Sequence, residues 1–327
     1  MLQLLKNNNP FTVLILFIFA LIVKIQILIH PILPLPIPKH LMYNFVLTAL
    51  AFIFKQNAFI YCLFSVILVF IQALYLNNIS VRHKLFHRFT FVPAFVFVLM
   101  STYAPNFLPF NETLIINFLL LGSLDIMFGF SQTNQPRKLI FNASMLLSLA
   151  VFFQFTMLAF FLLLVVGMVL FRSFNAGEWS VALMGYLTPV YFIVCILFLV
   201  DNLAFFSSLR HLGFSLSLEN KPNLYQIISF SGISLLLISG MYAMQINIAM
   251  SSIYIRRDWT AIIFYFILSL IAGFVTDFTI KSAWLITVPP MSFIISHILL
   301  LEKNKRLSNF IFYLSLLLLV FNIWVNK

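Results

Sequence analysis

The sequence predicts an all-α protein, a polytopic bundle of about 10–11 transmembrane helices with one short re-entrant or interfacial helix, forming a single transmembrane domain over residues 1–327. Of its 327 residues, 63% are apolar and 8% are charged, against about 45–50% and about 25% in a soluble domain. Nineteen basic and eight acidic side chains cannot coat a water-soluble particle of this size. The composition therefore excludes soluble enzymes and nucleic-acid binders, and the net charge of +11 indicates loops that face anionic lipids.

Nine apolar segments approach the roughly 20 residues that a membrane-spanning helix needs. They lie at 11–29, 58–76, 89–104, 113–130, 181–200, 226–249, 259–276, 283–301 and 308–325. Residues 41–54 are apolar but too few to cross, and four prolines between 31 and 38 keep the preceding chain extended. We expect 41–54 to form the re-entrant or interfacial helix.

Residues 139–171 are too many for one crossing, because a single helix would measure about 50 Å. A break near Gln154 gives two short crossings, eleven spans in all and a cytoplasmic N-terminus. Two crossings leave twelve basic residues inside and six outside, whereas one crossing gives ten and eight. The positive-inside rule therefore favours two crossings in an inner membrane. The lone amide of Gln154 is expected to form an interhelical hydrogen bond.

The predicted inside face carries most of the basic residues. They are Lys6, Arg82, Lys84, Arg88, Arg137, Lys138, Arg172, Arg256, Arg257, Lys303, Lys305 and Arg306. Those outside are Lys39, Lys55, Arg210, Lys221, Lys281 and Lys327. The densest cluster, Arg82–Arg88, is expected to orient the protein, and it could hold lipid phosphate.

Two features of the spans bear on helix packing. With only nine glycines, close glycine-mediated packing is not expected to be the main means of assembly. Pro189 and the Pro289-Pro290 pair each fall within a predicted span, where proline kinks a helix.

Two ionisable residues within spans are candidates for function. Lys24 lies about five residues from the outer end of the first span, and we expect its amine to snorkel to the headgroups. Asp125 lies near the inner end of its span, roughly 15 Å from the depth of Lys24, so the two should not pair. We expect Asp125 to pair with an inner-rim cation such as Arg137, Lys138 or Arg172, or else to bind a transported proton or a substrate.

A polar segment after residue 171 joins two predicted spans. Arg172 ends one helix, where a cation favours the helix dipole, and Asn175 or Ser173 caps the next. Glu178 lies near the start of that helix, where an ion pair with Arg172 is expected, and Trp179 is an interfacial anchor. The candidate inner-rim site consists of Asp125, Arg137, Arg172, Glu178 and Trp179.

The opposite rim collects acids and bases that could line one cavity. The candidate outer-rim residues are Lys39, His40, Asp201, Asn202, Arg210 and His211, with Glu112, Asp277 and Lys281 nearby. None has the spacing of a known catalytic, metal-binding or nucleotide-binding motif. Cys62 and Cys195 lie in apolar runs without a companion ligand. We therefore expect no metal and no cofactor, and whether the protein is an enzyme stays open.

The segment Phe171–Trp179, followed by Gly185 and Pro189, resembles a motif of an uncharacterised family of polytopic membrane proteins from Bacteroidota, a domain of unknown function. The opening segment 6–10, His30-Pro31 and the Pro289-Pro290 span are similar too, so the resemblance covers nearly the whole chain. The family pattern has Pro and Arg where this chain has Ser173 and Gly177. The resemblance implies no activity.

The predicted topology is also similar to that of integral-membrane glycosyltransferases. Those enzymes place a catalytic acid in the first outer loop, whereas residues 30–57 contain no acidic residue. This resemblance implies handling of a lipid-linked sugar or another envelope lipid or solute, by transport or as a degenerate relative of the enzymes. The alternative is a non-catalytic scaffold or subunit of an envelope assembly. Expected partners are anionic headgroups at the cytoplasmic rim, and a lipid-linked glycan or an envelope protein.

Overall fold

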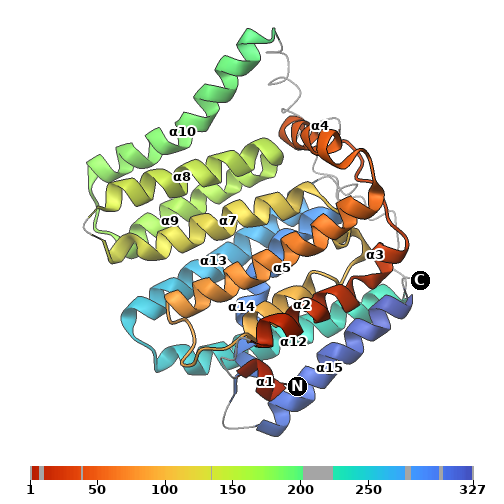
Figure 1. Cartoon of the computed structure of the whole chain (residues 1–327). Coiled ribbons are helices and arrows are strands. Elements are labelled where there is room, and N and C mark those ends of the chain that lie inside the picture. The colour runs from red at the N-terminus through yellow and green to blue at the C-terminus, as the bar shows by residue number, and fades with distance from the viewer. Residues whose placement is uncertain are drawn as a thin grey trace.

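The structure, a computed structural model, describes residues 2–6, 11–37, 40–133, 135–201, 224–276, 281–301 and 305–325. Within these ranges it is all-α and forms a bundle of helices (Figure 1). The α-helices are α1 (Leu2–Lys6), α2 (Phe11–Val23), α3 (Ile25–Ile29), α4 (Leu41–Phe54), α5 (Ala58–Arg82), α6 (Val92–Met100), α7 (Glu112–Phe128), α8 (Pro136–Phe153), α9 (Phe161–Phe171), α10 (Ala176–Leu199), α12 (Leu224–Ala249), α13 (Ile253–Val275), α14 (Val288–Leu299) and α15 (Lys305–Val325). The 3₁₀ helices are η1 (Pro105–Phe107), η2 (Gly129–Ser131), η3 (Phe155–Phe160) and η4 (Lys281–Thr287).

Eight of the described helical segments are long and apolar enough to cross a membrane. They lie in α5, α7, α8, α10, α12, α13 and α15, and in the segment Ser282–Leu299, which consists of most of η4 and all of α14. The apolar segments 11–23, 42–54 and 155–171 are shorter. The predicted fold class, an all-α helix bundle of a multi-pass membrane protein, is confirmed.

The helix predicted to break near Gln154 does so. Helix α8 ends at Phe153, and Gln154 is extended, with φ −151° and ψ 120°, before the chain returns through η3 and α9. The Nε2 atom of Gln154 donates a hydrogen bond to Oγ1 of Thr276, after α13, at 2.8 Å. Both the break and the interhelical hydrogen bond are therefore confirmed.

The core of the bundle lies around two short helices, α6 and α14, which pack against each other. Every residue of α6 is buried, and 83% of the α14 segment is buried. Ser292 and Ser296 each donate to the carbonyl oxygen four residues earlier, so their hydroxyls are satisfied without a partner from another helix. These two helices are surrounded by protein over most of their surface.

The proline pair does not kink a continuous helix, contrary to our expectation. Pro289 and Pro290 lie in the first turn of α14, directly after the 3₁₀ helix η4. The first turn of an α-helix has no intrahelical partner for its N–H groups, so proline is tolerated there. Pro189, by contrast, lies inside α10, the least buried of the long helices, and the second half of α10 points away from α8 (Figure 1).

Helix α4 has the bounds that the sequence predicted for the short helix. It ends in a turn in which Lys55 and Gln56 have φ values of 49° and 57°. Asn57 then caps α5 by accepting a hydrogen bond from the N–H of Phe59 at 3.0 Å. Helix α4 contacts α8 at one end of the bundle (Figure 1).

Two helix contacts depend on glycine, although the number of glycines argued against such packing as the main means of assembly. A Cβ on Gly185 of α10 would lie 2.1 Å from Oγ of Ser144 and 2.7 Å from the carbonyl oxygen of Phe141, both on α8. A Cβ on Gly240 of α12 would lie 2.8 Å from the carbonyl oxygen of Ile294 on α14. At these points the two backbones approach too closely for any side chain.

Gly185→Ala should therefore destabilise the contact between α10 and α8. Its methyl group would displace backbone atoms, which cannot move without the rest of α8, at a cost of about 1–3 kcal/mol. Thermal unfolding of the purified protein in detergent measures the effect. The matched control is Gly129→Ala, where the added Cβ would meet only Leu139 at 3.4 Å. Equal melting temperatures for the two variants would show the prediction to be wrong.

Candidate functional site

Basic residues gather on one face of the bundle, which we call the basic face. The N–H of Phe91, in the segment between α5 and α6, donates a hydrogen bond to the carbonyl of Leu5 in α1. Nζ of Lys6 donates to Oγ of Ser308 in α15, so α1 contacts both elements on this face. Figure 1 shows the N-terminus beside the start of α15. The described basic residues of this face are Lys6, Arg82, Lys84, Arg88, Arg137, Lys138, Arg172, Arg256, Arg257, Lys305 and Arg306.

Asp125, near the end of α7, is the centre of a polar cluster on this face. Its Oδ2 accepts hydrogen bonds from Nη1 of Arg82 at 2.9 Å and from the hydroxyl of Tyr75 at 3.1 Å. Its Oδ1 lies 2.8 Å from Nε2 of His83. Asp125 is 8% exposed, so this carboxylate is paired on both oxygens while nearly shielded from water.

The end of α5 places these partners. Arg82 is its last residue and His83 its C-cap, and Lys84 has a left-handed φ of 52° that turns the chain back. The imidazole of His83 packs edge-on against Phe128 of α7, with ring centroids 5.1 Å apart. The Nδ1 atom of His83 is buried without a hydrogen-bond partner. The histidine therefore offers one nitrogen to Asp125 and keeps the other free.

Asp125 pairs with a basic residue of the inner rim, as expected, but the three residues named as examples were wrong. We expected Arg137, Lys138 or Arg172, whereas the structure pairs Asp125 with Arg82 and His83. The reason is that α5 and α7 run parallel in contact, so the end of α5 meets the end of α7. The basic cluster Arg82–Arg88 could have indicated these partners, because it follows a predicted span that ends on the same face as Asp125. Sequence reasoning missed Tyr75, which looks like an ordinary aromatic residue within a span.

The predicted ion pair between Arg172 and Glu178 is confirmed. It is bidentate, with Nη2 to Oε1 at 2.7 Å and Nε to Oε2 at 3.1 Å. The hydrogen bonds that Glu178 accepts raise the pKa of Arg172 above its ordinary value. Asn175 caps α10 by accepting from the N–H of Gly177 at 3.0 Å, as expected. Trp179 is half-buried, and its ring lies 6.1 Å from that of Phe174, which is exposed.

Arg137 belongs to the same part of the basic face. Its Nη2 lies 3.5 Å from the position that a Cβ on Gly177 would take. The exposed guanidinium of Arg137 therefore lies beside the N-terminus of α10, next to the Arg172–Glu178 pair. We call Arg137, Arg172, Gly177, Glu178 and Trp179 the α10 corner. The structure brings four of the five predicted inner-rim residues together here and places Asp125 in a separate cluster.

A second histidine is buried at the basic face. His297, in the last turn of α14, packs between Phe86 and Trp259, with ring centroids 4.9 Å and 4.4 Å away. Its Nδ1 lies 3.3 Å from Nδ2 of Asn247, and its Nε2 is buried without a hydrogen-bond partner. Asp258, beside Trp259 in α13, is also buried. The sequence pointed to Asp258 only as part of the basic inner-rim segment Arg256-Arg257-Asp258, and it did not point to His297, which lies in an apolar span.

The opposite face brings together two of the residues predicted at the outer rim. Nδ1 of His40, just before α4, forms a short ion pair with Oε2 of Glu112, the first residue of α7. Glu112 is completely buried, and its Oε1 has no hydrogen-bond partner within the described ranges. Asp201 is exposed beyond α10 and takes part in none of the ion pairs among the described residues. The other predicted residues, Lys39, Asn202, Arg210, His211 and Asp277, lie outside the described ranges, and so does the predicted cavity.

Lys24 does not snorkel, contrary to our expectation. It lies at the break between α2 and α3, is 0% exposed, and its Nζ has no hydrogen-bond partner in the part of the chain that the structure describes. Lys24 does not pair with Asp125, as expected, because Asp125 pairs with Arg82 and His83. The packing of α2 and α3 against α5 leaves the amine no way to the surface.

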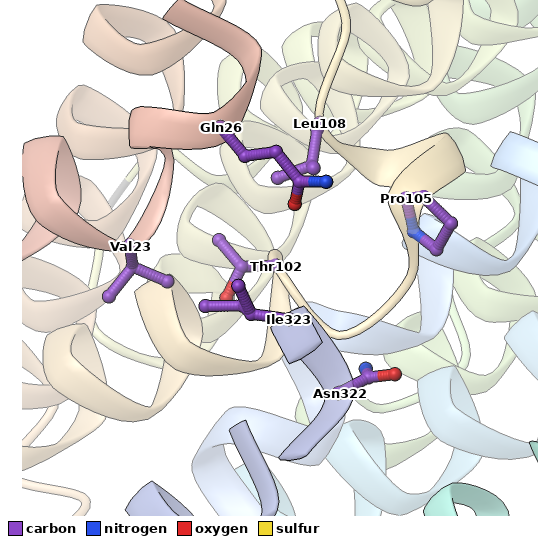
Figure 2. A pocket seen from close by; sticks show the side chains of 7 residues that line it. All are labelled: Val23, Gln26, Thr102, Pro105, Leu108, Asn322 and Ile323. Carbon is purple, nitrogen blue, oxygen red and sulfur yellow. The ribbon is translucent and has the colours of Figure 1, made fainter. Parts of the chain in front are cut away.

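A small pocket lies near Lys24, between α3, α15 and the loop after α6 (Figure 2). It is lined by Val23, Gln26, Thr102, Pro105, Leu108, Asn322 and Ile323. Its cavity volume is about 10 Å³, which is space for about one water molecule. The amide of Gln26 extends toward its centre, while Lys24 is not among the lining residues.

The described residues contain no group of three His, Cys, Asp or Glu side chains that could hold a metal ion. Cys62 is buried and Cys195 is half-buried, and both are free thiols. Comparisons of the chain with protein-family models, curated proteins and solved structures found no match. The functional interpretation therefore depends on the geometry of the two faces.

Asp125→Ala should lower the folded yield and the melting temperature. It leaves His83 and Arg82 without their acceptor, and a hydrogen bond to a charged group contributes about 1.5–3 kcal/mol. Size-exclusion chromatography of a fluorescent fusion and thermal unfolding in detergent measure the two effects. Asp201→Asn, which removes an exposed negative charge and tolerates the left-handed φ of 53° at this position, is the control and should match the wild type. A wild-type yield for Asp125→Ala would contradict the pairing.

Lys24→Met should have the opposite effect. It replaces a buried amine that has no partner with an apolar chain of similar length, so the free energy of unfolding should rise by about 1–3 kcal/mol. Lys55→Met, at an exposed lysine, should leave stability unchanged. A lower melting temperature for Lys24→Met would mean that the amine makes a stabilising contact.

Proposed function

We propose that this multi-pass membrane protein binds a phosphate-bearing lipid, such as a polyprenyl-phosphate sugar, at the α10 corner and moves or presents it in the cell envelope. The observation that supports this proposal is the position of Arg137. Its exposed guanidinium lies beside the N-terminus of α10, where the helix dipole favours an anion. Arginine is well suited to phosphate because its planar fork can donate two parallel hydrogen bonds.

The surroundings of the corner fit a lipid better than a free anion. Phe174 is exposed and Trp179 half-buried beside it, and aromatic side chains are enriched where headgroups meet the hydrocarbon. Glu178 neutralises Arg172, so Arg137 and the neighbouring Lys138 remain to attract a phosphate. Both are exposed on a face rich in basic residues, which attracts anionic headgroups in general.

The orientation is part of the proposal. The basic face carries the N-terminal helix α1, and basic residues concentrate on the cytoplasmic side of bacterial membrane proteins. We therefore place the N-terminus in the cytoplasm and the protein in an inner membrane. We also propose that the protein is related to the Bacteroidota family that its sequence resembles, whose motif has Arg where this chain has Gly177. Arg137 of α8 brings a guanidinium to that position from another helix.

The second candidate function is that of a non-catalytic scaffold in an envelope assembly. The exposure of helix α10 favours the scaffold function, because only 22% of its most apolar 18-residue stretch is buried within the protein. Its exposed residues include Leu187, Tyr191, Phe192 and Ile196, which form an apolar surface large enough for another transmembrane protein. A photo-crosslinker at position 192 that captures one protein, and not only lipid, would favour this function.

Arg137→Gln should weaken binding of polyprenyl phosphate about fivefold, since one basic residue near the surface contributes about 1 kcal/mol. Native mass spectrometry of the purified protein in mild detergent measures the bound fraction against lipid concentration. Arg257→Gln, on the same face but in α13, is the control and should bind as the wild type does.

The lipid arms of this experiment separate the possible ligands. Polyprenol, which has the same tail without phosphate, should bind poorly, and phosphatidylglycerol should compete weakly. Equal binding of polyprenol and polyprenyl phosphate, or equal affinity of the two arginine variants, would overturn the proposed function.

A further inference from the structure

Helix α7 carries a buried carboxylate at each end. Glu112 is its first residue and is 0% exposed, while Asp125 lies thirteen residues later and is 8% exposed. At 1.5 Å per residue the two lie about 20 Å apart along the helix, which is most of the thickness of a bilayer's hydrocarbon core. Acidic residues within spans are costly, and they mark ion pathways and proton relays.

Each carboxylate is held by a histidine from outside α7. His40 pairs with Glu112 on one face, and His83 pairs with Asp125 on the basic face. The unperturbed imidazole gains and loses a proton between about pH 5 and 8. A carboxylate–imidazole pair can therefore pass a proton between its two members at physiological pH, and α7 has one such pair at each end.

The other titratable groups around the two pairs are few. Arg82 and the phenol of Tyr75, both from α5, contact Asp125. Tyr43 of α4 lies near Glu112, and its hydroxyl donates to the carbonyl of Phe110. Helices α8 and α9 and the 3₁₀ helix η4, which also pack against α7, place no further ion pair on either carboxylate among the described residues.

Polar atoms without partners lie between the two pairs. Gln72 of α5 donates from Nε2 to the carbonyl of Leu114, and its Oε1 is buried and unbonded. Asn117 of α7 donates from Nδ2 to the carbonyl of Leu285 at 3.0 Å, and its Oδ1 is likewise unbonded. Oγ1 of Thr113 is a third such atom. All three side chains are fully buried, and buried polar atoms of this kind normally bind ordered water.

We call these residues and the two carboxylates the α7 seam: Glu112, Thr113, Asn117 and Asp125 of α7, and Gln72 and Tyr75 of α5, which packs against α7. The seam follows the contact between α5 and α7 and, through Asn117, the contact of α7 with η4. Buried polar atoms without partners occur elsewhere among the described residues too, for example at Asn77, Ser148 and Gln154, but those near α7 lie between two carboxylate–histidine pairs. Water bound by these amides and hydroxyls can pass protons where an aliphatic core cannot.

We propose that the protein moves protons between the two faces of the membrane along the α7 seam, taking them up at one carboxylate–histidine pair and releasing them at the other. Each step transfers one proton from a donor to an acceptor and changes no oxidation state. The activity is independent of lipid binding at the α10 corner, and a proton flux would be able to drive movement of a second substrate.

The test is proton flux through the full-length protein in liposomes. A potassium gradient with valinomycin sets the membrane potential, and an enclosed pH-sensitive dye reports the internal pH. We expect the wild type to change internal pH faster than protein-free liposomes do. Glu112→Gln and Asp125→Asn should each lower the protein-dependent rate at least tenfold, because an amide cannot carry the proton. Gln72→Leu, in the middle of the seam, should also lower it.

Asp258→Asn is the matched control, since it removes a buried carboxylate on the basic face that lies outside the seam, and it should keep the wild-type rate. If Asp125→Asn does not elute as folded protein, Tyr75→Phe replaces it, because the ring is retained and only the hydroxyl bonded to Asp125 is lost. A folded wild type no faster than empty liposomes would overturn the proposal. So would wild-type rates in Glu112→Gln and the Asp125 or Tyr75 variant. An unchanged rate in Gln72→Leu would overturn the route along the seam.

Discussion

The main constraint on this structure is that a carboxylate buried in a membrane protein must find a cation, a proton donor or a proton. Four of the acidic residues in the described ranges are buried: Glu112, Asp125, Glu178 and Asp258. Three of them pair with a basic side chain from another element: Glu112 with His40, Asp125 with Arg82, and Glu178 with Arg172. Each pair therefore joins two elements, so the few acids of this chain fix how several helices meet.

Helix α7 bears two of these pairs and is the clearest example. At one end Glu112 holds His40, which precedes the short helix α4, and at the other Asp125 holds the last turn of α5 and its C-cap. Partial burial strengthens such interactions, because little water competes for the charged groups. The same burial makes a missing partner costly, which is why the free nitrogen of His83 and the free oxygen of Glu112 suggest a role beyond structure.

Away from the acids, the bundle is held by contacts that carry no charge. Helices α6 and α14 are buried over nearly their whole surface, and Gly185 and Gly240 allow backbones to meet where a side chain would collide. Lys24 departs from this pattern. It is a fully buried amine without a partner, adjacent in sequence to residues that line a pocket for about one water molecule.

The sequence by itself determined the fold class, the positions of most of the spans, the break at Gln154 and the ion pair between Arg172 and Glu178, whereas the predicted spans 11–29 and 89–104 contain only helices too short to cross a membrane. These features depend on local composition or on residues close in the chain, such as an apolar run of about 20 residues or a cation six positions before an acid. The cap by Asn175 could be foreseen for the same reason. Local chemistry is sufficient where both partners belong to the same turn.

Only the tertiary structure decided which helices are neighbours, and with that the partners of Asp125. From the sequence, every basic residue of the inner face was a possible partner, because the order of spans does not fix their lateral arrangement. The contact of α5 with α7 selected Arg82, His83 and Tyr75, and the contact of α8 with α10 brought Arg137 to Gly177. Burial of Lys24 was likewise decided by packing, since snorkelling requires a free path along the helix surface.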